Sequence, residues 1–141
     1  MKIMVINGPN LNMLGVREKE VYGTKNFKEV IKYVKEEGEK RSLDITFFQS
    51  NIEGEIINAI QRAYFENFDG IIINPGAYTH YSYAIHDAIK GVSIRTVEVH
   101  LSNIHSREEF RKTSVTAPAC IGQISGFGEL GYVLAMEALL G

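Results

Sequence analysis

Short, near-continuous apolar runs constrain the fold of this chain more than any other feature. The segments KIMVIN (2–7) and GIIIN (70–74) are apolar at almost every position, and a Gly-Pro or Pro-Gly pair follows each of them. A strand has this composition when both of its faces are covered, as in a parallel sheet between layers of helices. The sequence therefore predicts buried strands with helices on both sides.

Three further segments read as strands, and helical patterns separate all of them. The additional strands are predicted at 44–50, 93–101 and 120–125. Apolar periodicity predicts helices at 26–38, 56–64, 81–89 and 130–140, and Ser106 with Glu109 predicts a capping box for one more short helix. Five strands that alternate with helices predict a flavodoxin-like three-layer αβα sandwich: a five-stranded parallel sheet in the order 2-1-3-4-5 within a single domain, 1–141.

Composition limits the possible partners. The formal net charge is −2, which gives no general attraction to nucleic acid or to an anionic membrane, and no segment approaches the length of a membrane span. The one cysteine, Cys120, cannot form a disulfide within the chain, as is usual in a reducing compartment. We therefore expect a cytoplasmic protein with neither nucleic acid nor membrane as a partner.

Polar side chains gather where the predicted strands end. Asn74 closes the run GIIIN, and Glu98, His100 and Ser102 alternate along TVEVHLS, so these three project from one face of an extended chain. Ligands bind at the carboxyl ends of such sheets. A carboxylate beside an imidazole can orient it and favour its protonated form, which suits a general acid. A solvated strand face would show the same alternation.

Commoner kinds of site find no support in the sequence. There is no P-loop, no GxGxxG and no GxSxG, and the four histidines lack the spacing of a metal site, so we predict neither cofactor nor metal. Arg17, Arg107 and Arg111 could frame an anionic substrate, since guanidinium binds carboxylate in a planar, bidentate manner. These arginines could instead form ordinary ion pairs with carboxylates at the surface.

The segment NLNMLGVREKEVYGT (10–24) carries the most informative arginine and tyrosine, Arg17 and Tyr22. A phenol ionises near pH 10, so a tyrosine that acts as a base needs a cationic neighbour. One charge at roughly 4 Å contributes on the order of 4 kcal/mol at an effective dielectric near 20. An exposed loop tyrosine without a role is common, but a closing lid could bring base and arginine together.

The sequence resembles the type II 3-dehydroquinate dehydratase family over nearly its whole length. The matching segments are INGPNLNMLGVREKEVYG (6–23), SNIEGEIINAI (50–60), INPGAYTHYSYAIHDAI (73–89), EVHLSNIHSREEFRKTS (98–114) and GQISGFGELGY (122–132). The resemblance implies a lyase of the shikimate pathway, which leads to chorismate and the aromatic amino acids. Its reaction is a trans-dehydration of 3-dehydroquinate to 3-dehydroshikimate through an enolate.

The resemblance also implies roles for particular residues. Tyr22 corresponds to the family's base, supported by Arg17, and His100 to its acid, with Glu98 beside it. Asn12 corresponds to an active-site amide, and several further residues to substrate-binding positions. Asn74 matches the residue that holds an enolate-stabilising water, Arg107 matches a motif position, and Asp87 matches a residue that reaches a neighbouring subunit. The full set of substrate-binding positions is Asn74, His80, Asp87, Leu101, Ser102, Arg107 and Arg111.

Assembly and the alternatives to catalysis complete the sequence-based expectations. The resemblance implies a homododecamer built from trimers, although Tyr81, Tyr83 and His86 stand where smaller residues and often an arginine are expected. A binding protein for a small anionic polyol could use the same rim without turnover. A flavin carrier is the third possibility, but no phosphate cradle is visible in the sequence.

Overall fold

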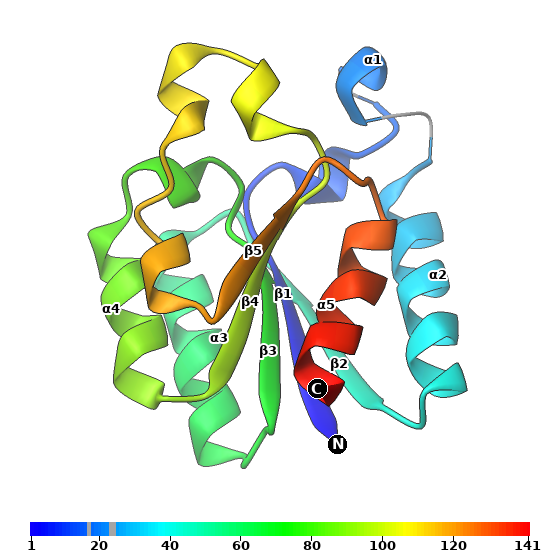
Figure 1. Cartoon of the computed structure of the whole chain (residues 1–141), viewed down its shortest axis with the longest axis vertical. Helices are drawn as coiled ribbons and strands as arrows, with labels where there is room; N and C mark the ends of the chain where they lie inside the picture. Colours follow the sequence, from blue (N-terminus) through cyan, green and yellow to red (C-terminus); the bar gives the residue numbers. More distant parts are fainter. Residues whose placement is uncertain (17, 23–24) are drawn as a thin grey trace.

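Five parallel strands form one sheet in the order β2-β1-β3-β4-β5, which confirms the prediction (Figure 1). The computed structural model describes residues 1–16, 18–22 and 25–141, without the side chain of Lys19. The strands are β1 (Lys2–Asn7), β2 (Asp44–Gln49), β3 (Gly70–Asn74), β4 (Arg95–His100) and β5 (Gly122–Ser125). All neighbouring strands pair in parallel, so their carboxyl ends share one edge of the sheet.

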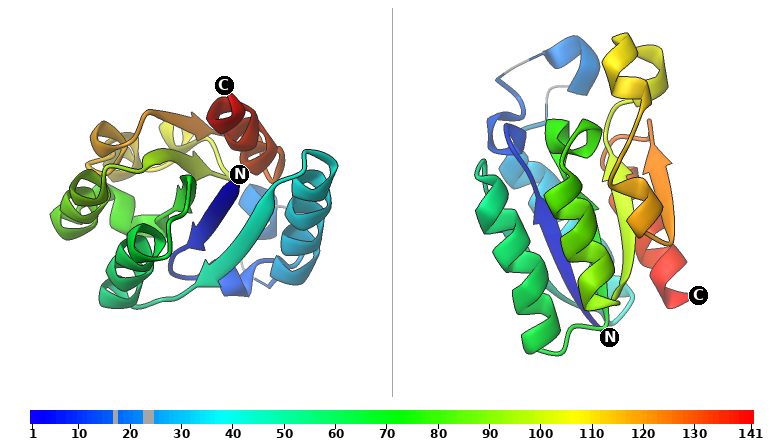
Figure 2. Two further views of the ribbon diagram at one scale, coloured as in Figure 1. Left: turned by 90° about the horizontal axis from the view of Figure 1, so that it is seen from below. Right: turned by 90° about the vertical axis from the view of Figure 1, so that its left-hand side faces the viewer.

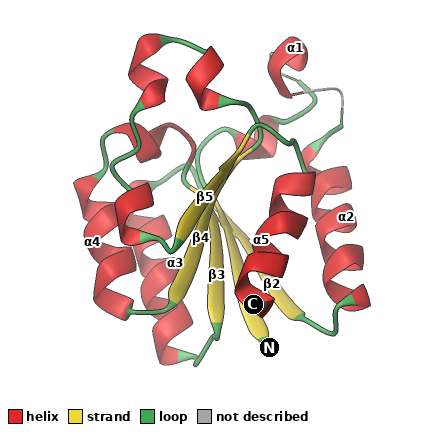
Figure 3. Ribbon diagram, in the orientation of Figure 1, coloured by secondary structure: helices red, strands yellow, loops and turns green. Residues whose placement is uncertain are grey.

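Helices cover both faces of the sheet and complete the three layers of a flavodoxin-like fold (Figures 2 and 3). Helices α2 and α5 lie on one face, and α3 and α4 lie on the other (Figure 1). The helices are α1 (Lys19–Tyr22), α2 (Phe27–Lys40), α3 (Glu53–Phe65), α4 (Tyr83–Val92) and α5 (Leu130–Leu140). In the described part of the chain, no helix combines the length and apolarity needed to cross a bilayer.

Strand β1 explains why the predicted strands are apolar at every position. Ile3 and Val5 pack into the core on the α2 and α5 face, while Met4 and Ile6 pack into the core on the α3 and α4 face. All four side chains are fully buried. The burial of apolar surface on both faces therefore fixes β1 near the centre of the sheet.

Helix α2 begins with the predicted capping box. The backbone N–H of Glu29 donates to Asn26 Oδ1 at 2.9 Å, and the Glu29 carboxylate accepts from the Asn26 backbone. The helix continues past Gly38, where the sequence suggested its end. A Cβ at Gly38 would lie 2.3 Å from Ile45 Cδ1, so this glycine serves close packing against β2.

The segment after β4 differs from the prediction. No helix capped by Ser106 and Glu109 forms; two 3-10 turns, Ile104–Ser106 and Glu109–Lys112, stand in its place. Ser106 Oγ donates to the Asn103 carbonyl at 2.9 Å instead of capping a later turn. The extended backbone of Arg107 separates the two turns and interrupts any continuous helix.

Other boundaries shift for local reasons. Strand β5 begins two residues later than predicted, because the 3-10 turn Ala117–Ala119 precedes it. Helix α4 begins after Ser82, whose side chain caps it by accepting the Ile85 N–H at 3.0 Å. Strand β4 starts after Ser93, which ends α4 in a left-handed conformation.

The loops that follow β1 and β3 approach each other closely. The Gly8 N–H donates to the Asn74 carbonyl at 2.7 Å. A Cβ at Gly8 would lie 2.5 Å from the Pro75 carbonyl oxygen, so a larger residue would push the two loops apart. This contact positions the loops at the carboxyl edge of the sheet, where the candidate site lies.

Candidate active site

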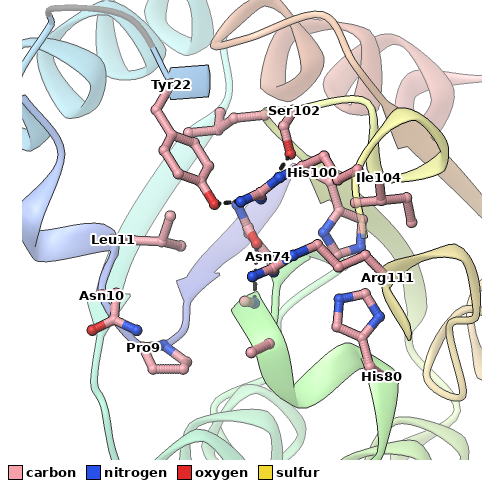
Figure 4. Close-up of a pocket in the computed structure, with 14 residues that line it drawn as sticks. Pro9, Asn10, Leu11, Tyr22, Asn74, His80, His100, Ser102, Ile104 and Arg111 are labelled. Atoms are coloured by element: carbon pink, nitrogen blue, oxygen red, sulfur yellow. Dashed lines mark hydrogen bonds between the residues drawn. The ribbon is translucent and has the colours of Figure 1, made fainter. Parts of the chain in front are cut away.

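A cavity of about 100 Å³ opens at the carboxyl edge of the sheet (Figure 4). Residues from five separate segments of the chain line it: Pro9, Asn10, Leu11, Tyr22, Asn74, Gly76, Ala77, His80, His100, Leu101, Ser102, Ile104, Arg107 and Arg111. The place agrees with the rule that ligands of open α/β sheets bind beyond the carboxyl ends of the strands. The lining combines apolar side chains with a phenol, two imidazoles and two guanidinium groups.

His100 and Glu98 form a buried pair at the end of β4. His100 is 5% exposed and Glu98 is 0% exposed. His100 Nε2 lies 2.9 Å from Glu98 Oε2, and both side chains project from the same face of the strand, as their spacing predicts. The pair is therefore held by the sheet rather than by a mobile surface contact.

The environment of Glu98 keeps its carboxylate ionised. Burial alone would raise the pKa of Glu98, but hydrogen bonds and charge from His100, together with hydrogen bonds from Thr116 and Gln123, outweigh burial and lower it to about 2. An ionised carboxylate accepts hydrogen bonds and donates none. The hydrogen bond to Glu98 therefore comes from a proton on His100 Nε2.

Tyr22 enters the cavity from α1 and meets a guanidinium from the far side of the site (Figure 4). Arg107 Nη1 donates to the Tyr22 hydroxyl at 2.7 Å, and the guanidinium carbon lies 5.3 Å from the centre of the tyrosine ring. The Arg107 side chain is 10% exposed. A largely buried guanidinium therefore holds the hydroxyl of Tyr22 in place at the cavity.

Arg107 also contacts a carboxylate on the same segment as Tyr22. Its Nη2 atom lies 3.4 Å from Glu18 Oε2, and its Nη1 atom lies 3.5 Å from Ser102 Oγ. Arg107 thus links the Tyr22 segment to the end of β4. Sequence reasoning assigned Arg107 to a motif position but did not foresee its contact with the tyrosine, since 85 residues separate the two.

His80 and Arg111 lie beside each other on the rim of the cavity (Figure 4). His80 Nδ1 donates to the Thr113 carbonyl at 2.8 Å, and burial lowers the pKa of His80, so this imidazole is mainly neutral near pH 7. Arg111 forms an ion pair with Glu108 at 3.1 Å. Together they offer a neutral imidazole and a cation to a polar, anionic ligand.

The floor of the cavity is formed by strand ends. Asn74 is 3% exposed and accepts the Gly76 N–H at its Oδ1 atom at 3.1 Å, which turns the loop after β3. Leu101 and Ser102 directly follow His100 and contribute to the same wall. The structure therefore brings together eight predicted site residues that line the cavity: Tyr22, Asn74, His80, His100, Leu101, Ser102, Arg107 and Arg111. Glu98 stands behind His100.

Three predicted site residues are not placed at the cavity. Arg17 lies outside the described residues. Asn12 is exposed and lies 3.4 Å from Gln49 Nε2, whereas Asn10, which the sequence analysis did not single out, lines the cavity. Asp87 lies on α4 with its side chain 81% exposed, and its carboxylate lies 3.0 Å from His86 Nδ1. The assigned roles of Arg17, Asn12 and Asp87 stay predictions.

The fold and the site define a class of enzyme: a flavodoxin-like α/β protein with imidazoles and a phenol around a small, cation-rimmed cavity. Residues 1–140 match the model of the family described as Dehydroquinase class II. The chain belongs to the class II dehydroquinase family, as its resemblance suggested.

Individual relatives agree with this assignment. A 3-dehydroquinate dehydratase of Clostridium beijerinckii is 75% identical over 99% of this chain and 95% of its own length. The crystal structure of a type II dehydroquinase from Butyrivibrio crossotus has a TM-score of 0.99 and 54% identity, and covers 100% of this chain and 98% of the other. A type II dehydroquinase from Propionibacterium acnes has a TM-score of 0.94 and 39% identity, and covers 98% and 94%.

Proposed function

We propose that this protein dehydrates 3-dehydroquinate to 3-dehydroshikimate through an enolate, with Tyr22 as base and His100 as acid. The observation that carries the proposal is the presence of both groups in one cavity, each with a charged partner: Arg107 for Tyr22 and Glu98 for His100. The family and the names of close relatives support the same substrate.

The phenolate of Tyr22 removes the proton alpha to the ketone, and the electron pair of that bond forms the enolate. The guanidinium of Arg107 donates to the phenolic oxygen at 2.7 Å, so it is placed to hold that oxygen while the proton is transferred. Arg17, assigned to this role by resemblance, would add a second cation. The proposed base is thus held by guanidinium partners.

Protonated His100 then gives its Nδ1 proton to the departing hydroxyl as the enolate collapses and the carbon–oxygen bond breaks. Water leaves, and the new double bond is conjugated with the ketone. Glu98 holds Nε2 of the ring and compensates the charge of the imidazolium, which suits His100 to general acid catalysis. The phenolate of Tyr22 gains one proton and the imidazolium of His100 loses one. A net proton transfer from Tyr22 to His100 then restores both groups for the next turnover.

Recognition of the substrate is proposed for the rim. Arg111 and His80 can bind its oxygen atoms, and the main chain and hydroxyl at Leu101 and Ser102 can bind its carboxylate. Asn74 would hold a water on the enolate oxygen. Asn12 and, from a neighbouring subunit, Asp87 complete the set that the resemblance implies.

Assembly and location are part of the same proposal. We expect a homododecamer built from trimers, as the resemblance to the family implies, in which Asp87 would reach the site of a neighbouring subunit. A cytoplasmic location is expected because the one cysteine, Cys120, fits a reducing compartment.

A spectrophotometric assay with 3-dehydroquinate tests the function. We expect growth of the absorbance of the conjugated enone product with the purified protein alone. A binding protein for an anionic polyol would bind 3-dehydroquinate in calorimetry without any product, and a flavin carrier would be yellow when purified. Either result would refute the proposal.

The enolate mechanism has a separate chemical test. No lysine lines the cavity among the described residues, so no Schiff base should form with the ketone. Treatment with borohydride in the presence of substrate should leave the protein mass unchanged. A trapped covalent adduct would show that the mechanism is wrong even if the dehydration itself is confirmed.

A further inference from the structure

Glu98 is enclosed by three donors that lie outside its own strand. Ser114 Oγ and Gln123 Nε2 donate to Glu98 Oε2 at 2.9 and 2.7 Å, and Thr116 Oγ1 donates to Oε1. We call Ser114, Thr116 and Gln123 the Glu98 cradle. None of the three is among the described residues that line the cavity, so none is placed to touch the substrate.

A third hydroxyl, outside the Glu98 cradle, supports the direction of these hydrogen bonds. Thr79 Oγ1 lies 2.6 Å from Thr116 Oγ1 and 2.9 Å from Ser114 Oγ, and Ser114 Oγ also accepts the Ala117 N–H at 3.0 Å. Each hydroxyl has one proton to give and can accept others. When Ser114 and Thr116 give theirs to Glu98, Thr79 can give its proton to either of them, and every group is satisfied.

This pattern requires Glu98 to accept from all sides. Four donors, including His100 Nε2, surround two carboxylate oxygens at a residue with no exposed area. A protonated carboxyl would bring its own O–H among groups that already donate, so the cradle favours the anion. Without the cradle, the carboxylate could rotate away or take the Nε2 proton of His100.

We infer that Thr116, Gln123 and Ser114 are positioning residues for proton donation by His100. They hold the Glu98 carboxylate so that the imidazole keeps its Nε2 proton and presents Nδ1 to the leaving hydroxyl. The inference rests on the proposed function for the identity of the proton acceptor. The part that concerns the His100 tautomer depends on the structure of the free enzyme alone.

Matched threonine variants separate positioning from a merely structural role. Thr116→Val removes the hydroxyl and keeps the shape, and Thr116→Ser restores the hydroxyl. Thr96→Val is the control. Thr96, on β4, is buried like Thr116, but its hydroxyl donates to the Ile94 carbonyl at 2.9 Å and not to Glu98. We expect Thr116→Val to lower kcat roughly tenfold or more with KM changed less than about twofold, while the other two variants stay within about threefold of wild type.

Nitrogen-15 NMR of the ligand-free protein provides a readout that does not need turnover. The His100 signals, assigned by their loss in His100→Gln, should show a protonated Nε2 in the neutral imidazole of the wild type. In Thr116→Val they should move toward a mixture of tautomers, and Thr116→Ser should restore them. Gln123→Met is the second variant if Thr116→Val fails to fold, since Gln123 is half-buried on the edge strand β5.

The outcomes are distinct. Wild-type kcat or unchanged His100 signals in the variant that folds would overturn the inference, as would failure of Thr116→Ser to restore them. Absence of turnover in every protein, the wild type included, would refute the proposed function instead. The NMR comparison would still decide whether the cradle sets the tautomer.

Discussion

The two sides of the cavity are built in different ways. On the acid side, His100 ends a buried strand, and the Glu98 behind it accepts four hydrogen bonds. On the base side, Tyr22 projects from the four-residue helix α1, next to the exposed Val21, and meets Arg107 from a distant loop. The sheet therefore sets the orientation of the proposed acid, whereas a contact between two surface segments sets that of the proposed base.

This difference teaches where the site tolerates change. A change on the acid side has to disturb a buried network, which affects stability and catalysis together. A change on the base side can remove catalysis and leave the fold intact, because α1 contributes little to either core cluster beyond the packing of Tyr22. The following experiments break or sharpen this comparison, from the largest expected effect to the smallest.

Removal of the phenolic hydroxyl should give the largest effect. For Tyr22→Phe we expect kcat to fall by about 10²- to 10⁴-fold, since a general base is lost. Binding of a substrate analogue in calorimetry should stay within about threefold, and thermal unfolding should be unchanged. Tyr33→Phe, a half-buried tyrosine on α2, is the control. Full activity of Tyr22→Phe would show that the base is another group.

Loss of the guanidinium should follow. Arg107→Met keeps much of the side-chain length but removes the hydrogen bond to Tyr22, and hydrogen bonds to charged groups contribute about 1.5–3 kcal/mol, so we expect kcat to fall about 10- to 100-fold. Arg107→Lys should lie between this variant and wild type. Arg62→Met is the control, because Arg62 pairs with Glu66 on the surface near the end of α3. Equal kcat values for the two methionine variants would contradict a role for Arg107.

The buried Glu98 carboxylate should make the stability of the protein depend on pH. The pKa of Glu98 is lowered from 4.5 to about 2, so its contribution is complete above about pH 4.5 and disappears as pH falls toward 2. Linkage gives up to about 3 kcal/mol for such a shift. The free energy of unfolding, measured with urea between pH 5 and pH 2, should depend less steeply on pH for Glu98→Gln than for wild type. Glu39→Gln, at an exposed carboxylate on α2, should keep the pH dependence of the wild type. The same pH dependence in all three proteins would show that Glu98 does not have a lowered pKa in the folded state.

The smallest effect is expected where α2 begins, just after the Tyr22 segment. Asn26→Ala removes the capping box and should cost about 1 kcal/mol of unfolding free energy, with kcat unchanged within about twofold. Asn26→Asp should retain most of the stability. A large loss of kcat in Asn26→Ala would mean that the start of α2 helps to hold the base, and the contrast between the two sides would need revision.

Much of the fold could be predicted because its signals are local. The runs KIMVIN and GIIIN form β1 and β3 with the predicted bounds, and the apolar periodicity places α2 and α5 on the sheet. The segment after β4 could not be predicted, because the extended backbone of Arg107 breaks a helical pattern that the residues alone would permit. Boundaries near Ser82 and Gly122 moved for similar reasons of capping and turn geometry.

The candidate site divides in the same way. Glu98 and His100 are brought together by the alternation of an extended strand, which spacing in the sequence encodes. Thr116 and Gln123 reach Glu98 from other segments, and no local pattern points to them. Asn10, rather than Asn12, lines the cavity, because the left-handed backbone at Asn10 turns the chain after β1.

The sequence by itself determined the layers and the placing of Glu98 and His100 on one face of a strand, because burial on two faces and strand alternation are properties of neighbouring residues. The tertiary structure alone decided that Arg107 meets Tyr22 and that hydroxyl and amide donors enclose Glu98. These contacts join segments that are distant along the chain, 85 residues apart for Arg107 and Tyr22. The paths of the connecting loops set them, and those paths depend on packing that no local pattern records.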